Sequence, residues 1–289
     1  MDNIRGAVLM VLAMAGFALE DMFIKLLADA VSVGQILTML GIGGSLAFGA
    51  VVVARGEALF ARTMLSYPIV LRGLGDLIGA LAFVSAIVLT PLSSASAILQ
   101  ATPLAVTLGA ALFLGEPVGW RRWSAIFVGL IGVLLIIRPG LDSFEVLSLL
   151  ALLAVFALAL RDLATRRTPA SITTMQLSFL GFVVIIPAGI LLMVFTGSQV
   201  VALNGTEWIY IGAALGIGLF AYYAIVAAMR VGDVGFVTPF RYIRLVFALV
   251  IGVSVFGESP DALTLIGAAI IVASGIYTIL RERKVRARA

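Results

Sequence analysis

Ten apolar runs, each close to a membrane span in length, dominate this 289-residue chain. A helix of about 20 apolar residues crosses the hydrocarbon core of a bilayer, where lipid offers no hydrogen bonds to an open backbone. The hydrophobic share is 62%, against about 45–50% in soluble domains. The sequence therefore predicts an all-α integral membrane protein with ten transmembrane helices, at residues 4–27, 33–54, 68–89, 93–114, 119–138, 146–163, 172–196, 207–229, 235–256 and 261–280.

Lysines and arginines are distributed unevenly over the predicted loops. If the amino terminus is cytoplasmic, only Arg138 falls on the outer side. Most of the others share the cytoplasmic side, namely Arg5, Arg55, Arg62, Arg121, Arg122, Arg161, Arg166, Arg167, Arg230, Arg281, Arg283, Lys284, Arg286 and Arg288. Cytoplasmic loops carry the positive excess in membrane proteins. We therefore expect a multi-pass protein with both termini in the cytoplasm.

Two stretches of the chain resemble each other at an offset of 142 residues. Residues 112–116 (LFLGE) correspond to residues 254–258 (SVFGE), and each stretch is followed by a turn and another span. Each half then contains five spans. Because five is odd, the halves cross the membrane in opposite senses, as in many secondary transporters. We predict two inverted five-helix repeats, residues 1–142 and residues 143–289.

This organisation resembles the drug/metabolite transporter superfamily, in particular its ten-helix branch built from two EamA-type repeats. The likeness rests on residues 101–104 (ATPL) and on the runs that end at Glu116 and Glu258, and it extends over essentially the whole chain. Within the superfamily the chain is most similar to bacterial amino-acid exporters of the YddG type. The resemblance implies a carrier of small metabolites in the bacterial inner membrane that works without ATP.

Among the charged residues of the predicted spans, we assign seven to the membrane interior, namely Glu20, Asp21, Lys25, Arg72, Asp76, Arg241 and Arg244. A charge at this depth is costly and marks a functional site by default. Lys25 follows Asp21 by four residues and Asp76 follows Arg72 by four, which is pairing distance along a helix. Glu20 has no such partner, and the bases exceed the acids by one.

The surplus positive charge predicts a docking point for a carboxylate. Arg244 lies near the middle of its span, with Arg241 three residues before it on the same face. A guanidinium group presents a two-donor fork that matches a carboxylate, and Glu20 would receive an ammonium group. Together they suit a small zwitterionic substrate. The alternative is that Glu20 and Arg244 neutralise each other and join two helices.

Polar residues and prolines interrupt the fourth and ninth spans. Five residues of the fourth span share one helical face, namely Ser93, Ser96, Gln100, Pro103 and Thr107. Pro103 and Pro239 each remove a backbone donor. Paired interruptions in the two halves predict a binding site at the membrane midplane. The alternatives are simple packing kinks and hydrogen bonds between helices.

Tyrosines and glycines complete the candidate residues. Tyr222, Tyr223 and Tyr242 fall within spans, where they could stack on an aromatic or apolar group of the substrate. Two GxxxG pairs are candidates for close helix packing, namely Gly75 with Gly79 and Gly212 with Gly216. We interpret Glu116 and Glu258 as structural acids near helix ends.

Residue types exclude several kinds of chemistry. The sequence contains no cysteine and no histidine, so we expect no cofactor and no bound metal. It contains no phosphate-binding motif for ATP, and we attribute its basic tail to the anionic inner leaflet rather than to nucleic acid. The expected partners are a small zwitterionic substrate and the lipid bilayer, with a monomer as the simplest form of the carrier.

We therefore expect a secondary transporter, not an enzyme, that exports amino acids, aromatic or other apolar ones among them, and related small metabolites across the inner membrane by alternating access. The alternative is a multidrug or organic-cation exporter of the same superfamily. The expected substrate-binding residues are Glu20, Asp76, Gln100, Pro103, Tyr222, Tyr223, Pro239, Arg241, Tyr242 and Arg244. The acids that could couple transport to protons are Glu20, Asp21 and Asp76.

Overall fold

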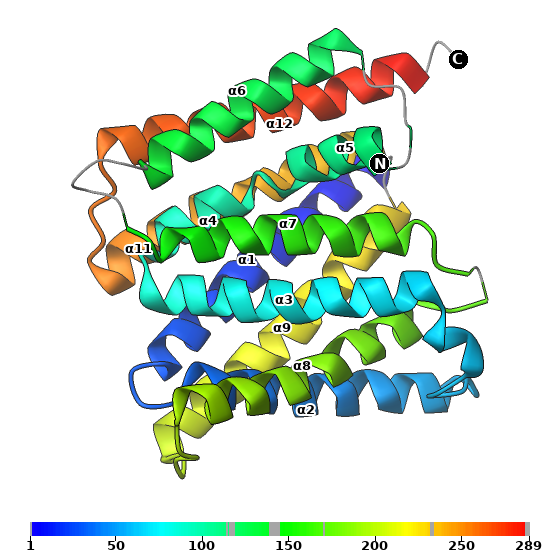
Figure 1. Ribbon diagram of the computed structural model, residues 1–289, viewed down its shortest axis with the longest axis vertical. Helices are drawn as coiled ribbons and strands as arrows, with labels where there is room; N and C mark the ends of the chain where they lie inside the picture. Colours follow the sequence, from blue (N-terminus) through cyan, green and yellow to red (C-terminus); the bar gives the residue numbers. More distant parts are fainter. Residues whose placement is uncertain are drawn as a thin grey trace.

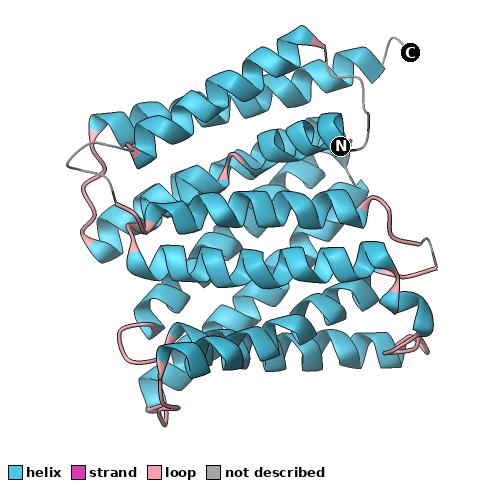
Figure 2. Ribbon diagram, viewed as in Figure 1, coloured by secondary structure: helices cyan, strands magenta, loops and turns pink. Residues whose placement is uncertain are grey.

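The computed structural model describes residues 2–113, 115, 119–138, 145–169, 171–231 and 234–286, and the regular structure in these ranges is helical (Figure 2). The α-helices are α1 (Asp2–Leu27), α2 (Val33–Ala54), α3 (Tyr67–Leu89), α4 (Leu92–Leu99), α5 (Thr102–Phe113), α6 (Trp120–Ile137), α7 (Ser148–Thr165), α8 (Thr174–Thr196), α9 (Gly205–Val231), α10 (Val234–Val237), α11 (Ile243–Phe256) and α12 (Ala262–Arg286). Two 3-10 helices, η1 (Arg62–Leu65) and η2 (Thr238–Tyr242), lie between them.

The membrane-crossing segments agree with the predicted spans. In the described ranges, nine helical segments are long and apolar enough to cross a bilayer, and Trp123–Ile137 is a shorter apolar helix. That helix corresponds to the fifth predicted span, in which Arg121 and Arg122 precede the apolar stretch. The predicted all-α membrane fold with two inverted repeats is confirmed.

The helices run alternately in opposite directions along the bundle (Figure 1). Both termini lie at the same end, which we call the terminal end (Figure 1). The loops with Arg55 and Arg62 and with Arg166 and Arg167 lie at this end too. The opposite end, which we call the far end, contains the connections α1–α2, α3–α4, α8–α9 and α11–α12.

The closest helix pairs join one half of the chain to the other. α1 packs along α9, α2 along α8, α3 along α7 and α6 along α12. If the spans of the second half are matched in order to those of the first half, α7 corresponds to α1 and α9 corresponds to α3. The contact between α1 and α9 then corresponds to the contact between α7 and α3. A two-fold axis between inverted repeats produces this correspondence. The predicted boundary between residues 142 and 143 lies outside the described residues, as does Glu116.

Two of the membrane-crossing segments are broken, as the prolines predicted. Gln100 and Ala101 separate α4 from α5, and η2 separates α10 from α11. Pro103 lies in the first turn of α5, where its missing amide is tolerated. Thr102 Oγ1 donates a hydrogen bond to the Leu99 carbonyl oxygen at 2.6 Å. That carbonyl is the one that Pro103 leaves without its helical donor, so a side chain satisfies it.

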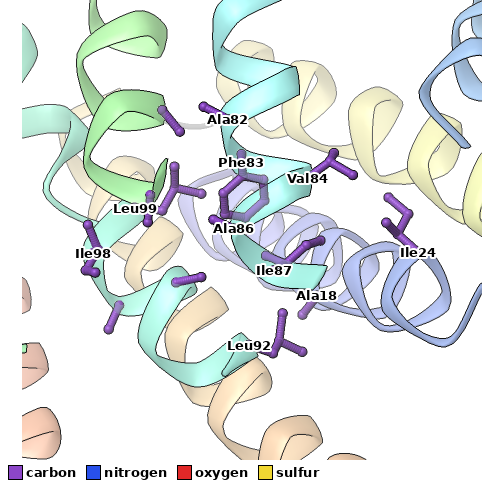
Figure 3. Packing of buried hydrophobic residues seen from close by; sticks show 14 of the residues in the cluster. Ala18, Ile24, Ala82, Phe83, Val84, Ala86, Ile87, Leu92, Ile98 and Leu99 are labelled. Carbon is purple, nitrogen blue, oxygen red and sulfur yellow. The ribbon is translucent and has the colours of Figure 1, made fainter. Parts of the chain in front are cut away.

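The central core surrounds α3. Phe83, Ala86 and Ile87 of α3 are buried between Ala18 of α1 and Leu99 of α4 (Figure 3). Ala86 and Ala18 carry small side chains that let these helices approach closely. Phe83 therefore belongs both to the core and to the surroundings of the two broken segments.

Glycines on α3 permit its contact with α7. A Cβ atom at Gly75 would lie 2.7 Å from the Ala157 carbonyl oxygen, and one at Gly79 would lie 2.7 Å from a methyl group of Leu158. The predicted packing role is confirmed for this pair. It is wrong for Gly212 and Gly216, because a Cβ atom at either position of α9 meets nothing within 4 Å.

Gly75→Ala is expected to lower the free energy of unfolding by about 1–3 kcal/mol, because the added methyl group would force backbone atoms of α7 away. The matched control is Gly212→Ala, which should be neutral or stabilising by up to about 1 kcal/mol, since alanine favours the helix and has free space. Unfolding in detergent solution measures both. Equal stability of the two variants would contradict the packing role of Gly75.

Candidate functional site

The two broken segments contact each other near their breaks. α4 packs against α11, and Gln100 Nε2 donates to the Arg241 carbonyl oxygen at 3.4 Å. Broken helices leave backbone groups that a continuous helix would satisfy internally, which a membrane tolerates only inside the protein. In membrane carriers such helices line the solute site. We call residues 96–103 and 238–244 the crossing and take it as the candidate site.

Arg244 links three helices at the crossing. Its Nη2 donates to Asp21 Oδ2 of α1 at 2.6 Å. Its guanidinium carbon lies 5.4 Å from the ring centroids of Phe17 and Phe83, and aromatic rings attract a cation at such distances. The predicted pairing of Asp21 with Lys25 is therefore wrong, and the ion pair that joins the first span to the ninth is formed by Asp21 with Arg244, where the alternative had placed Glu20. Tertiary packing turns the buried Asp21 side chain toward α11 instead.

Glu20 has no ion pair or hydrogen bond in the part of the chain that the structure describes. Its carboxylate lies against α9, where a Cβ atom at Gly218 would be 2.6 Å from Glu20 Oε1. A partly buried carboxylate without a partner is costly. Glu20 therefore remains available to a cationic group.

Unsatisfied polar atoms gather at the crossing. Within the described ranges, the buried side-chain atoms without a hydrogen-bond partner are Ser66 Oγ, Ser96 Oγ, Tyr242 OH and Arg244 Nε. All but Ser66 belong to the crossing, and the exposed fractions of Ser96 and Tyr242 are only 2% and 5%. Each unmade bond of this kind costs about 1–3 kcal/mol.

A second cluster of charges joins α3, α7 and α8. Arg72 Nη1 donates to Asp76 Oδ2 at 2.7 Å and to the Leu177 carbonyl oxygen at 3.0 Å. Arg161 Nη1 lies 3.8 Å from Asp76 Oδ1, and its Nη2 lies 2.8 Å from Asp162 Oδ1. The predicted Arg72–Asp76 pair is confirmed. Every charge of this cluster has a partner of opposite sign, so the cluster ties helices together.

Glu258 folds back onto α4 at the far end. Gly257 ends α11 with a φ of +63°, and the Glu258 amide donates to the Gly252 carbonyl oxygen at 2.9 Å. A residue with a positive φ at the end of a helix is most often glycine, because glycine has no Cβ atom to strain this conformation. The turn directs the Glu258 carboxylate toward the first amides of α4. It accepts hydrogen bonds from Leu92 N at 2.5 Å and Ser93 N at 3.0 Å.

The same carboxylate joins α1 to this end of the bundle. Glu258 Oε2 accepts from Ser93 Oγ at 2.6 Å, and Glu258 Oε1 lies 3.4 Å from Lys25 Nζ. Lys25 Nζ also donates to the Thr90 carbonyl oxygen at 2.7 Å. A negative charge is favourable at the positive end of a helix. We call Lys25, Ser93 and Glu258 the far-end tie.

The predicted surplus of one positive charge is wrong, because it counts Lys25 without Glu258. Inside the bundle the acids are Glu20, Asp21, Asp76, Asp162 and Glu258, and the bases are Lys25, Arg72, Arg161, Arg241 and Arg244. The two sets balance. In the described ranges, the charges of this set without an ion pair are Glu20 and Arg241.

An open pocket of about 280 Å³ lies at the far end. Ser93 and Glu258 of the far-end tie line it, together with Ser148 of α7 and Thr264 of α12. No residue of the crossing lines it. The pocket is therefore a surface depression at the far end that does not reach the crossing.

Asp261 connects this pocket to α6. Its Oδ1 accepts hydrogen bonds from Arg138 Nη2 and, at 2.9 Å, from Thr264 N. The bond from Arg138, followed by the bonds from Thr264, lowers the pKa of Asp261 from 3.8 to about 2. A depressed pKa stabilises the fold above the unfolded-state value, and this contribution disappears as the pH falls through the folded-state value.

Asp261→Asn should therefore lower the melting temperature at neutral pH by a small amount, since the carboxylate is half-exposed. The difference from the wild-type protein should shrink between about pH 4 and pH 2, where Asp261 becomes protonated. Melting in detergent across this range measures it. A difference that stays constant down to pH 2 would contradict the ionic contact with Arg138.

The predicted site residues divide into four groups. Those that lie at the crossing are Gln100, Pro103, Pro239, Arg241, Tyr242 and Arg244, and those beside it are Glu20 and Asp21. Asp76 belongs to the second charged cluster. Tyr222 bonds to Ser178 Oγ and contacts Phe48 with ring centroids 5.0 Å apart, whereas Tyr223 is 70% exposed and lies apart from the crossing.

Sequence reasoning missed the inward role of Arg161 and Asp162. It placed Arg161 on the cytoplasmic side, but α7 continues to Thr165 and the side chain reaches Asp76. The internal repeat contained a signal, because Asp162 corresponds to Glu20 at the offset of 142 residues. No such spacing connects Lys25 to Glu258.

The sequence profile of the EamA-like transporter family matches residues 4–138 and, a second time, residues 147–281. The chain belongs to this family. EamA-like proteins are transporters and not enzymes, and the fold contains two repeats. The chain is therefore a multi-pass membrane transporter of a bacterial family.

Three EamA-like relatives differ in the solutes that they are named for. A riboflavin transporter of Vibrio cholerae is 32% identical over 200 residues, which cover 67% of this chain and 64% of that protein. An S-adenosylmethionine uptake transporter of Rickettsia felis is 26% identical over 219 residues, or 76% and 74% of the two chains. The pseudopaline exporter CntI of Pseudomonas aeruginosa is 28% identical over 276 residues, or 94% of each.

These names establish transport for the EamA-like relatives, but they include both uptake and export, and none of the three specifies amino acids. The chain also resembles a solved crystal structure, with a TM-score of 0.58 and 21% sequence identity. The match covers 95% of this chain and 98% of the other. At this identity the likeness concerns the fold alone.

Proposed function

We propose that this protein is a secondary transporter that exports amino acids, aromatic or other apolar ones among them, and related small zwitterions across the bacterial inner membrane. It alternates between inward-open and outward-open states, and solute gradients drive net transport. Both termini lie in the cytoplasm, because the terminal end carries most of the basic residues. A reporter enzyme that works only in the periplasm should be inactive when fused to either terminus.

The crossing supports this function best. It combines two broken helices, one from each half, with three buried polar atoms that lack hydrogen-bond partners. Glu20 provides a carboxyl group that has no ion pair within the described residues and lies close enough to Arg244 to interact with its charge. A solute that offers a cation, an anion and hydrogen-bonding groups within a few ångströms matches this arrangement.

An amino acid provides these groups in one small molecule. Its ammonium group would bind Glu20, and its carboxylate would bind a guanidinium of the crossing. Phe17 and Phe83, which flank Arg244, and Tyr242 would contact an apolar or aromatic side chain of the solute.

The relatives add support from solute chemistry. S-adenosylmethionine, named for the Rickettsia protein, carries the ammonium and carboxylate groups of an amino acid. The Pseudomonas relative, which aligns over 94% of this chain, is named as an exporter. Export of zwitterionic metabolites is therefore compatible with the family.

Counterflow in proteoliposomes tests the proposal. Vesicles loaded with an unlabelled amino acid should take up the same labelled amino acid faster than empty vesicles do. The reason is that the binding site of a carrier returns to the outside faster with an amino acid bound than empty. The panel should include aromatic, aliphatic and charged amino acids, with riboflavin as a competitor. Runs with and without a pH difference show whether protons are coupled. Absence of acceleration across the panel would overturn the proposal.

An organic-cation or multidrug exporter is the second candidate. It is favoured by one observation, namely that among the described residues Glu20 has no ion pair, while Asp21 pairs with Arg244. In that function only the acid would contact the solute. Glu20→Gln should then abolish binding, whereas Arg244→Gln should leave solute affinity unchanged.

A further inference from the structure

On one edge of the Arg244 guanidinium group, only one of the two hydrogen-bond donors has an acceptor. Nε and Nη2 point to the same side of the planar group, and a carboxylate binds this edge best through two parallel hydrogen bonds. Nη2 donates to Asp21 Oδ2 at 2.6 Å, while Nε is buried and has no hydrogen-bond partner among the described residues. Asp21 therefore makes one of the two bonds that the edge offers.

Asp21 nevertheless satisfies the charge of Arg244. Asp21 is 3% exposed, and in the described ranges the two residues form their ion pair with each other. Phe17 and Phe83 flank the guanidinium group, so few directions of approach remain. A carboxylate that arrives from a solute would have to bond where Nε is free and Asp21 now lies.

We propose that Asp21 is a tethered substitute for the carboxylate of the solute. It occupies Arg244 in the empty carrier, and a solute carboxylate displaces it by forming both bonds to Nε and Nη2. Asp21 is thus an internal competitor that sets the affinity for solutes with a carboxylate. This inference rests on the proposed transport of zwitterions.

The competition also links binding to movement. The Asp21–Arg244 pair joins α1 of the first half to α11 of the second. A solute changes a conformational equilibrium only through its different affinities for the two states. Displacement of Asp21 removes a bond between the halves, so the loaded carrier changes state more readily than the empty one. Exchange should therefore be faster than net transport.

The experiment compares Asp21→Asn with the wild-type protein, and with Asp29→Asn as a matched control in the exposed α1–α2 connection. The probes are L-phenylalanine, which carries the carboxylate, and L-phenylalaninamide, which lacks it. Without its internal competitor, the Asp21→Asn protein should bind L-phenylalanine about tenfold more tightly, while the affinity for the amide should change by less than about twofold. The ratio of exchange to net transport should fall.

Arg244→Lys provides a second variant, in case Asp21→Asn does not fold with Arg244 left unpaired. Lysine keeps the positive charge but has no two-donor edge. The preference for L-phenylalanine over its amide should therefore fall by about tenfold, which corresponds to about 1.4 kcal/mol.

The outcomes separate this inference from the proposed function. If the wild-type protein binds neither probe nor any other amino acid, the proposed function and this inference both fail. If the wild-type protein transports L-phenylalanine but Asp21→Asn weakens or does not change its binding relative to the amide, only this inference is overturned. An unchanged preference in Arg244→Lys overturns it as well.

Discussion

Glu258→Ala is expected to lower the free energy of unfolding by about 3–5 kcal/mol, the cost of removing one member of a buried ion pair. The side chains of Lys25 and Glu258 are mostly buried, so Lys25 would keep its charge without an anion. The amides of Leu92 and Ser93 would also lose their acceptor. Equilibrium unfolding in mixed detergent micelles measures the loss.

Three comparisons isolate the far-end tie. Glu258→Gln keeps an acceptor for the α4 amides but removes the charge, so its loss should be smaller. The double variant Lys25→Met with Glu258→Gln removes both charges and should regain stability over Glu258→Gln alone. Ser259→Ala, at the exposed neighbouring position, should change stability by less than about 0.5 kcal/mol. If Glu258→Ala is as stable as Ser259→Ala, the tie does not stabilise the fold.

Glu20→Gln should reduce the affinity for a transported amino acid by about 30-fold or more, because losing one partner of a buried charge pair costs about 2 kcal/mol at least. Within the part of the chain that the structure describes, Glu20 has no hydrogen bond or ion pair to lose, so the fold should tolerate the change. Counterflow at a series of amino-acid concentrations measures the affinity. Glu207→Gln, in the first turn of α9, removes the same charge away from the crossing and should transport normally.

Gly218→Ala should displace the Glu20 carboxylate without removing it. The new methyl group would lie 2.6 Å from Glu20 Oε1, and the flexible carboxylate can move away. We therefore expect a weaker loss of amino-acid affinity than in Glu20→Gln, with little loss of stability. Normal affinity in both variants would exclude Glu20 from the solute site.

The helices were predictable because the residues that determine where a helix begins, ends or breaks lie within that helix or next to it in the sequence. An apolar run of span length has no other stable conformation in lipid, and α2 has the predicted bounds, 33–54. Ser32 caps this helix, its Oγ accepting from Gln35 N at 3.3 Å. The two broken segments were predictable from Pro103 and Pro239, because a proline disturbs the hydrogen bonds of the helical turn in which it lies.

The partners of the buried charges were not predictable in this way. Spacing along a helix suggested that Asp21 pairs with Lys25, but Asp21 pairs with Arg244, 223 residues away. Lys25 pairs with Glu258, 233 residues away. A hydrophobic pattern specifies which face of a helix is buried and leaves the neighbouring helix undefined. Arg72 and Asp76 were predicted correctly because both lie on one helix.

The pairing of α1 with α9, α2 with α8, α3 with α7 and α6 with α12 has a consequence for biosynthesis. A ribosome adds about 5–20 residues per second, so α1, α2 and α6 enter the bilayer seconds before their main neighbours α9, α8 and α12 exist. During that interval the nascent chain must wait loosely packed in lipid, with Asp21 and Lys25 still lacking the partners that the last helices supply. Truncation after the first half should therefore leave an insertion product that quality-control proteases can attack.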